Sequence, residues 1–164
     1  MLAKAIQKKK ILQMSRYEKL KEEIKKHEGF SNAPYQLEYK DADGVLVKEG
    51  FMTGGYGHKI IPGEIVPNDK EGWDKLFEKD FKKALEGAEE LLDGFTIKDD
   101  AKDVIIEMCY QMGKYGTAKF KRMFLALQIP DYVLAAHEMS NSKWAVQTPS
   151  RANRMAIKMR NNAT

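Results

Sequence analysis

The chain is poor in cysteine and histidine and has no long apolar run. Its one cysteine, Cys109, cannot form an intramolecular disulfide and excludes a zinc site built on cysteines. With three histidines and no metal-ligand spacing among them, we expect neither a metal nor another cofactor. No stretch approaches the roughly eighteen apolar residues that span a bilayer, so we expect no transmembrane helix.

A secretion signal is also missing. Lys4, Lys8, Lys9 and Lys10 lead into mixed polar sequence, without an apolar core or a small-residue cleavage site. We therefore expect synthesis in a cytoplasm without a Sec-type signal. The excess of one charge is small, because 28 Lys and Arg face 24 Asp and Glu, for a net charge of +4. That balance fits nucleic acid, a membrane surface or an acidic wall polymer equally well.

The composition is that of one folded domain. The 164 residues are 43% hydrophobic and 32% charged, which suits a chain with a real core. We expect a basic N-terminal extension over 1–14 and a single domain over 15–164. Within that domain we expect a β-rich lobe at about 28–68 and a helical lobe at about 73–161, which packs with a helix over 15–27.

Helical periodicity dominates both ends of the chain. Apolar residues at three- and four-residue steps predict a helix over 2–27 that ends at Gly29. Ser15 and Glu18 form a candidate capping box and give an alternative start for this helix. Thr96 with Asp99, and Thr148 before Pro149, are candidate caps for later helices. These later helices are expected over 73–93, 96–113, 118–127, 131–139 and 148–160.

Residues 30–62 change to an alternating pattern around Asp41-Ala-Asp-Gly44, which predicts a β-hairpin. The run from Thr53 to His58, Thr-Gly-Gly-Tyr-Gly-His, predicts a strand whose backbone passes close to another group. The order helix, small antiparallel sheet, helices is α+β, with the long 73–93 helix joining the lobes and the site expected between them.

Several polar residues are candidates for chemistry. Glu28 ends a helix, where the dipole raises the pKa of a carboxyl, as a general acid near neutral pH requires. By position alone, the commoner explanation is one more charge in a Lys/Glu-rich helix. Glu49 and Thr53 share strand parity, so both side chains are expected on one face, where the Thr53 hydroxyl can hold a water. Asp41 and Asp43 are explained by turn chemistry.

Other candidates have structural explanations beside functional ones. We expect His58 to hydrogen-bond an acidic residue and Cys109 to lie in the core. Arg151, Arg154 and Lys158 lie on one face of the last helix. That face is either solvated or aims an arginine at a carboxylate.

These residues resemble a known family. Glu28-Gly29, a tyrosine seven residues beyond the glutamate, and Thr53-Gly-Gly-Tyr-Gly-His58 are similar to the signature of phage T4-type lysozymes, glycoside hydrolase family 24. The second half agrees in the same order, so the resemblance covers about residues 17–160. Its matches there are Tyr110-Gln-Met-Gly113, Gly116 with Phe120, Ser142-Lys-Trp144, Gln147-Thr-Pro-Ser-Arg151-Ala152 and Arg154.

The resemblance implies a lysozyme-like fold and hydrolysis of the β-1,4 bond between N-acetylmuramic acid and N-acetylglucosamine in peptidoglycan. It assigns Glu28 as the general acid and Arg151 as its partner. It assigns Thr53, with a second carboxylate, to position the attacking water. The remaining matches are Tyr110 and Gln111, which line the substrate site, and Trp144, a buried structural tryptophan.

The second carboxylate departs from the family pattern. The family places it about two residues after the tyrosine, but that position after Tyr35 is Leu37, and roughly ten extra residues precede Thr53. Asp41 keeps a Tyr-x-Asp pattern. Glu49 lies four residues before Thr53, on the same expected strand face.

Similarity to the family motif favours Asp41, whereas the expected distance to Glu28 favours Glu49. If each strand is about five residues longer, the hairpin tip moves about 16 Å at ~3.3 Å per residue. Asp41 then lies beyond the ~6.5–9.5 Å separation of an inverting pair. Glu49 stays near Glu28, so we favour Glu49 over Asp41, with Glu38 as a third choice. If none serves, the substrate's own 6-hydroxyl would close an anhydro ring and the enzyme would be a lytic transglycosylase.

Two other function classes stay open. A non-catalytic wall-binding module is possible on any fold, but Glu28, Thr53 and Arg151 together argue against it. A nucleic-acid-binding protein would need a basic surface interleaved with aromatics, which is lacking, so we expect no nucleic-acid partner. The expected partner is peptidoglycan and the expected state a monomer. The resemblance suggests a phage endolysin held in the host cytoplasm until a holin releases it to the wall, with a virion-carried lysozyme or a toxin-like effector as alternatives.

The resemblance leaves residues 1–14 uncovered. Leu2, Ile6, Ile11 and Leu12, beside the lysines of this segment, can form an amphipathic helix that touches anionic lipid or lipopolysaccharide. The alternative is an ordered or frayed helix start with solvated lysines.

Overall fold

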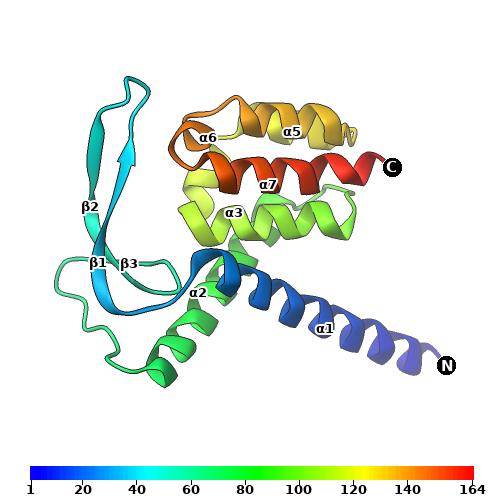
Figure 1. The fold of residues 1–164 in the computed structure, drawn as a ribbon. Coiled ribbons are helices and arrows are strands. Elements are labelled where there is room, and N and C mark those ends of the chain that lie inside the picture. Colours follow the sequence, from blue (N-terminus) through cyan, green and yellow to red (C-terminus); the bar gives the residue numbers. More distant parts are fainter.

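The computed structural model describes residues 1–164 and has an α+β fold (Figure 1). A three-stranded sheet and seven helices build it. In chain order these are α1 (Leu2–Glu28), β1 (Ser31–Lys40), β2 (Leu46–Gly55), β3 (His58–Ile60), α2 (Lys70–Leu91), α3 (Asp99–Ala118), α4 (Lys121–Gln128), α5 (Tyr132–Ser140), α6 (Lys143–Gln147), α7 (Pro149–Arg160) and a 3-10 turn (Asn161–Ala163). None of the helices combines the length and the apolar character needed to cross a membrane.

The first helix is one continuous element. The predicted end at Gly29 is confirmed, because this residue has φ 71° and closes α1 through its N–H to the Lys25 carbonyl. The alternative start at Ser15 is wrong, because α1 runs unbroken from Leu2. No glycine or proline interrupts this segment, and its Ala, Lys, Gln and Leu are good helix formers. Arg16 fixes the helix to α3 through Asp99 at 3.0 Å and Asp103 at 3.2 Å.

The sheet is antiparallel in the order β1-β2-β3. The predicted hairpin is confirmed, but the run from Thr53 to His58 is not one strand. β2 ends at Gly55, where φ is 58°, a turn follows at Tyr56–Gly57, and His58 opens β3. Two left-handed glycines in three positions reverse the chain there, which favours a turn over a straight strand.

The predicted close approach of the glycine run is confirmed. Trp73, at the start of α2, lies flat against it: a Cβ added at Gly54 would stand 2.6 Å from the indole ring, and one added at Gly55 would also collide with it. The Trp73 Nε1–H donates to the Asn32 carbonyl at 3.2 Å, so the same side chain also holds the start of β1. Trp73 therefore anchors the sheet to α2, the long helix that joins it to the helical lobe.

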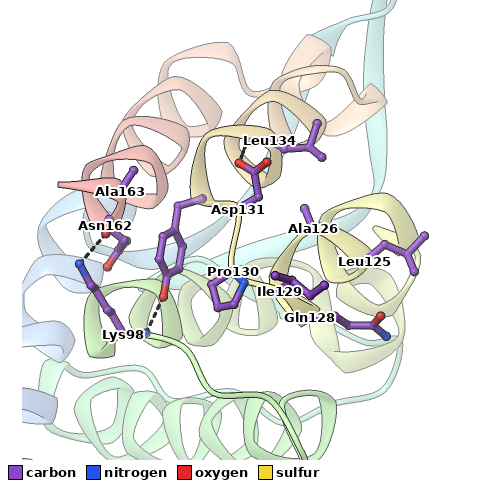
Figure 2. A pocket seen from close by; sticks show the side chains of 11 residues that line it. Lys98, Leu125, Ala126, Gln128, Ile129, Pro130, Asp131, Leu134, Asn162 and Ala163 are labelled. Carbon is purple, nitrogen blue, oxygen red and sulfur yellow. Dashed lines mark hydrogen bonds between the residues drawn. The ribbon is translucent and has the colours of Figure 1, made fainter.

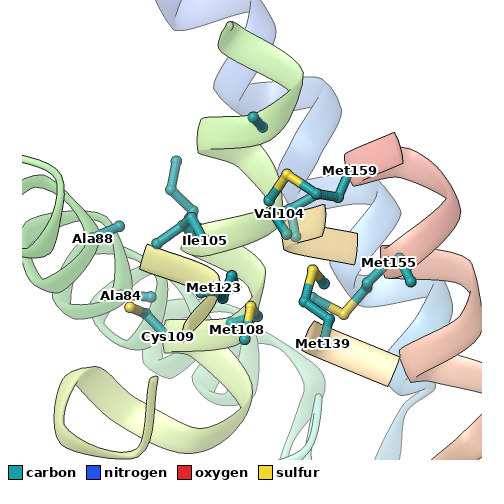
Figure 3. Close-up of a cluster of buried hydrophobic side chains, with 14 of the residues drawn as sticks. Ala84, Ala88, Val104, Ile105, Met108, Cys109, Met123, Met139, Met155 and Met159 are labelled. Atoms are coloured by element: carbon teal, nitrogen blue, oxygen red, sulfur yellow. The ribbon is translucent and has the colours of Figure 1, made fainter. Parts of the chain in front are cut away.

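The core lies among α2, α3, α4, α5 and α7, with Leu20 and Ile24 of α1 packed into it. Figure 3 shows its centre, where sulfur-containing side chains from four helices meet. Each large apolar side chain buried here contributes about 1.5–3 kcal/mol. Cys109 is buried among them, as predicted. The methionines of this centre are Met108, Met123, Met139, Met155 and Met159.

Helix starts in the second half differ from the sequence expectation in detail. Thr96 does not cap α3, which begins at Asp99 with no side-chain cap. Thr148 precedes α7 as predicted, but its hydroxyl donates to the Trp144 carbonyl at 3.0 Å and caps nothing. The predicted stop at Gly113 is a break inside α3, with φ 77°. The short helix α6 was not expected, because its five residues are too few to show a period.

Candidate active site

Glu28 and Arg151 meet at the centre of the site, although 123 residues separate them. Glu28 is the last residue of α1, and Arg151 lies in the first turn of α7. The guanidinium Nη2 donates to Oε2 of the carboxylate at 3.0 Å, and the glutamate side chain is only 11% exposed. Burial raises the pKa of Glu28, and this outweighs the opposing attraction of Arg151.

Two other cations on this face of α7, Arg154 and Lys158, also meet acids, so the face is not simply solvated. Arg154 Nη2 donates to Glu107 Oε1 of α3 at 2.7 Å, and Lys158 lies 3.4 Å from Glu23. The Glu107 side chain also lies 3.5 Å from His27 Nδ1. Three carboxylates from α1 and α3 therefore line up against one basic face of α7.

Glu107 is a site residue that we missed in the sequence. It is 5% exposed, and its negative charge further raises the pKa of Glu28. The available signal was a single charge inside the apolar run Val-Ile-Ile-Glu-Met-Cys over 104–109. A charged side chain within such an apolar helical segment is rarely buried unless it is paired. The segment therefore predicts a cationic partner elsewhere in the chain.

The turn between β2 and β3 is pressed against the Glu28 carboxylate. Gly57 has φ 74°, and a Cβ added there would collide with Glu28 Oε2. Two hydroxyls hold this turn: Tyr110 donates to the Tyr56 carbonyl, and Tyr56 donates to Asp74 Oδ1 at 2.8 Å. The sheet side of the site is thus positioned by α2 and α3.

Thr53 and Glu49 each bury an oxygen that has no hydrogen-bond partner. Thr53 is 1% exposed with Oγ1 unpaired, and Glu49 Oε2 is likewise buried and unpaired. Buried acceptors in a native fold normally have a partner, so unpaired ones indicate a place for a water or a substrate group. The β1–β2 ladder is irregular between the pairs Gln36–Met52 and Glu38–Lys48, so strand parity does not itself relate Glu49 to Thr53.

Tyr35 connects the candidate residues. It pairs with Thr53 across the β1–β2 ladder. Its pKa is raised, first by burial and then by the negative charges of Glu28 and Glu49, while Arg151 opposes them. Both carboxylates and the arginine are therefore close enough to this one phenol to influence its ionisation.

The two other candidate carboxylates are engaged elsewhere. Asp41 Oδ1 accepts from the N–H groups of Asp43 at 3.0 Å and Val45 at 2.9 Å, which is the turn chemistry expected of it. It lies six residues beyond Tyr35, or about 20 Å along the strand at ~3.3 Å per residue. Glu38 is exposed and lies 3.6 Å from Lys48.

Tyr110 and Gln111 line a cavity of about 340 Å³ together with Gly57, the residue that touches Glu28. Burial raises the pKa of Tyr110, so this phenol stays protonated and donates. The Gln111 Oε1 atom is buried without a partner, a third unpaired acceptor in this region. The cavity meets the site only through Gly57, because neither Glu28 nor Arg151 lines it.

A larger cavity lies elsewhere and contains none of these residues. Figure 2 shows it on the helical lobe, where α4 and α5 meet the C-terminal 3-10 turn, with a volume of about 790 Å³. Lys98 crosses its edge and donates to the Asn162 carbonyl at 2.7 Å. Its apolar lining of Leu125, Ile129 and Leu134 carries no reactive group.

His58 has the structural role that we expected. Its Nδ1 lies 2.6 Å from Asp80 and its Nε2 lies 2.9 Å from Glu64, so both ring nitrogens are paired with carboxylates. Trp144 is buried, as predicted, and packs edge-on against Phe120. No group of three His, Cys, Asp or Glu side chains is placed to hold a metal ion.

A comparison with models of known protein families finds no match. Among curated proteins, the chain is similar to two from Dictyostelium discoideum. It is 32% identical over 144 residues to "Probable T4-type lysozyme 2", covering 71% of this chain and 81% of that protein. It is 35% identical over 106 residues to "Probable T4-type lysozyme 1", covering 60% of this chain and 62% of that protein.

A third relative comes from a virus. The chain is 30% identical over 122 residues to "Peptidoglycan hydrolase gp36" of Pseudomonas phage phiKMV, covering 74% of this chain but 13% of that longer protein. The sequence signature, the α+β architecture and these relatives agree. The chain belongs to the family of T4-type lysozymes.

Proposed function

We propose that the chain hydrolyses peptidoglycan, at the β-1,4 bond between N-acetylmuramic acid and N-acetylglucosamine. The observation that carries this proposal is the buried Glu28 carboxyl, held by Arg151 with its pKa raised. Such a group keeps its proton closer to neutral pH and can donate it to the leaving glycosidic oxygen. The relatives named lysozyme and peptidoglycan hydrolase support the same substrate.

In the proposed mechanism Glu49 is the second carboxylate. A water held by Thr53 Oγ1 and Glu49 Oε2 would attack the anomeric carbon while Glu28 protonates the leaving oxygen. Both oxygens are buried and unpaired, which supports this assignment. Asp41 is the weaker candidate, because its carboxylate closes the hairpin turn about 20 Å along the strand from Tyr35.

Tyr110 and Gln111 would bind the sugar chain at the cavity beside Gly57. We further propose that the biological setting is lysis of a bacterial host by a phage, with release to the wall by a holin. The phage relative supports this setting, since its printed name describes a peptidoglycan hydrolase.

The test is a digest of purified peptidoglycan with soluble products identified by mass spectrometry. The wild type is expected to yield reducing muropeptides, Glu28→Gln and Glu49→Gln to yield almost none, and Asp41→Asn to remain active. Thermal unfolding of each variant serves as the folding control. Loss of products in Asp41→Asn alone would assign the second carboxylate to Asp41.

Other product patterns would contradict the proposal. Products lighter by one water, as an anhydro ring requires, would identify a lytic transglycosylase. A folded wild type that binds peptidoglycan and releases nothing would identify a wall-binding module.

A further inference from the structure

The first four turns of α1 carry the whole net charge of the chain. Residues 1–14 contain four lysines and no acidic residue, which leaves 24 Lys and Arg against 24 Asp and Glu in residues 15–164. None of these lysines takes part in an ion pair; the first basic residue of α1 that does is Arg16. The folded body is thus neutral overall, and one helix end is strongly basic.

This basic segment is also apolar and uncovered. Every residue from 1 to 15 is exposed, including Leu2 at 76% and Ile6 at 59%. Figure 1 shows this end of α1 extending past the other helices. Further along the same helix, Leu20 and Ile24 are buried by the body. Lys9 and Leu12 border a cavity whose other wall includes Leu85 of α2, and Leu2 and Ile6 are not part of it.

Four apolar side chains share one side of this helix end. At about 100° per residue, Leu2, Ala5, Ile6 and Leu12 fall within an arc of about 120°, whereas Ile11 and Met14 lie outside it. Lys4 and Lys8 lie outside that arc. Lys9 lies within it, where its methylene stem adds apolar area and its ammonium can extend to a polar layer.

We infer that residues 1–14 form a docking surface for an anionic lipid bilayer. A helix that pairs exposed aliphatic side chains with lysines lies in the interface plane, with its apolar side at the acyl boundary and its cations among anionic headgroups. Each lysine near such a surface strengthens binding about five-fold. This interaction is independent of the proposed hydrolysis.

Three other occupants fit less well. Single-stranded nucleic acid is bound by stacking its bases on aromatic side chains, and the first aromatic residue of the chain is Tyr17. The phosphates of a duplex would leave Leu2 and Ile6 without an apolar partner. An acidic wall polymer offers no hydrocarbon layer for Leu2, Ile6 and Leu12. A second copy of the chain would bring four lysines against four lysines, which repel.

The test is co-sedimentation of the full chain with vesicles. One set contains phosphatidylcholine with about 30% phosphatidylglycerol, and the other contains phosphatidylcholine alone. The wild type is expected to bind the anionic vesicles at least about ten-fold more tightly, with binding lost as salt rises to about 0.5 M. The triple variant Lys8→Gln/Lys9→Gln/Lys10→Gln is expected to bind about 100-fold more weakly.

A matched control shows whether vesicle binding depends on the lysines of residues 1–14 or on the net charge of the whole chain. Lys82→Gln/Lys119→Gln/Lys121→Gln removes the same three charges from exposed positions outside ion pairs, and its binding is expected to stay within about two-fold of wild type. Leu2→Ser/Ile6→Ser tests the apolar side and is expected to lower binding by at least about ten-fold. All variants should unfold at the wild-type temperature and digest purified peptidoglycan as the wild type does.

Three results would overturn the inference. The first is equal weakening by the control and the basic triple variant. The second is vesicle binding that does not depend on lipid charge. The third is concentration-dependent self-association, lost in Leu2→Ser/Ile6→Ser, without vesicle binding, which would show that a second copy covers this face.

Discussion

Asp80→Asn tests how the sheet is tied to α2. His58 opens β3, and its ring is clamped between Asp80 of α2 at 2.6 Å and Glu64 at 2.9 Å. The two side chains of the His58–Asp80 pair are 15% and 25% exposed. An exposed ion pair contributes up to about 1 kcal/mol, and breaking a buried one costs about 3–5 kcal/mol. Because the His58–Asp80 pair lies between these limits, we expect Asp80→Asn to lower the free energy of unfolding by about 2–3 kcal/mol. For a chain of this size that lowers the Tm by about 8 °C.

The loss of stability caused by Asp80→Asn is expected to depend on pH. The hydrogen bond to Asp80 is the largest cause that raises the pKa of His58 above its usual 6.5. The contribution of the charged pair is therefore complete below about pH 6.5 and is lost as the pH rises through the folded-state pKa. The loss caused by Asp80→Asn should be full at about pH 5.5 and fall below about 1 kcal/mol well above the folded-state pKa.

The assay is urea unfolding followed by tryptophan fluorescence at acidic, neutral and alkaline pH. Glu71→Gln is the matched control, because it breaks the exposed pair with Lys75 on the same helix. It should change stability by less than about 0.5 kcal/mol at every pH. An equal loss for Asp80→Asn at acidic and alkaline pH would refute the electrostatic reasoning.

Three further predictions concern the site and the core. Gly57→Ala forces a Cβ against the Glu28 carboxylate at a positive φ, so kcat/KM on peptidoglycan should fall by more than about ten-fold, with about 1 kcal/mol of stability lost in urea unfolding. Arg151→Ala removes the cation that holds the pKa of Glu28 down, so the alkaline limb of the pH–rate profile should move to higher pH; an unchanged limb would contradict the pairing. Met108→Ala leaves a cavity in the core and should cost about 2–5 kcal/mol, whereas Ile157→Ala on the exposed side of α7 should cost under about 0.5 kcal/mol.

The elements that could be predicted are those with local causes. Gly29 ends α1 and Gly113 breaks α3 because each takes a positive φ, and Pro149 starts α7 because it lacks an N–H. The hairpin follows from the Asp41–Gly44 turn, whose side-chain bonds form within four residues. Such signals lie inside the segment that they control, so a sequence can display them.

The features that were missed depend on distant partners. Thr96 is a good cap by type, but α3 begins after it, where Lys98 N–H donates to Tyr132 Oη at 3.0 Å. Ser15 could open a helix, but the preceding residues are good helix formers and nothing stops them. The sheet register near Glu49 could not be predicted from the sequence either, because residue type does not encode the irregular pairing of β2 with β1.

The proton affinity of Glu28 is likewise a property of the assembled helices. Two charges that act on its pKa, Arg151 and Glu107, come from α7 and α3, and they act in opposite directions. Arg154 neutralises Glu107, so the register of α7 determines how much of each charge Glu28 experiences. A small rotation or displacement of α7 would move both arginines together. A variant that loosens the packing of α7 should therefore shift the pH–rate profile before it unfolds the chain, and the chemistry proposed for Glu28 rests on the same contacts that hold this helix in place.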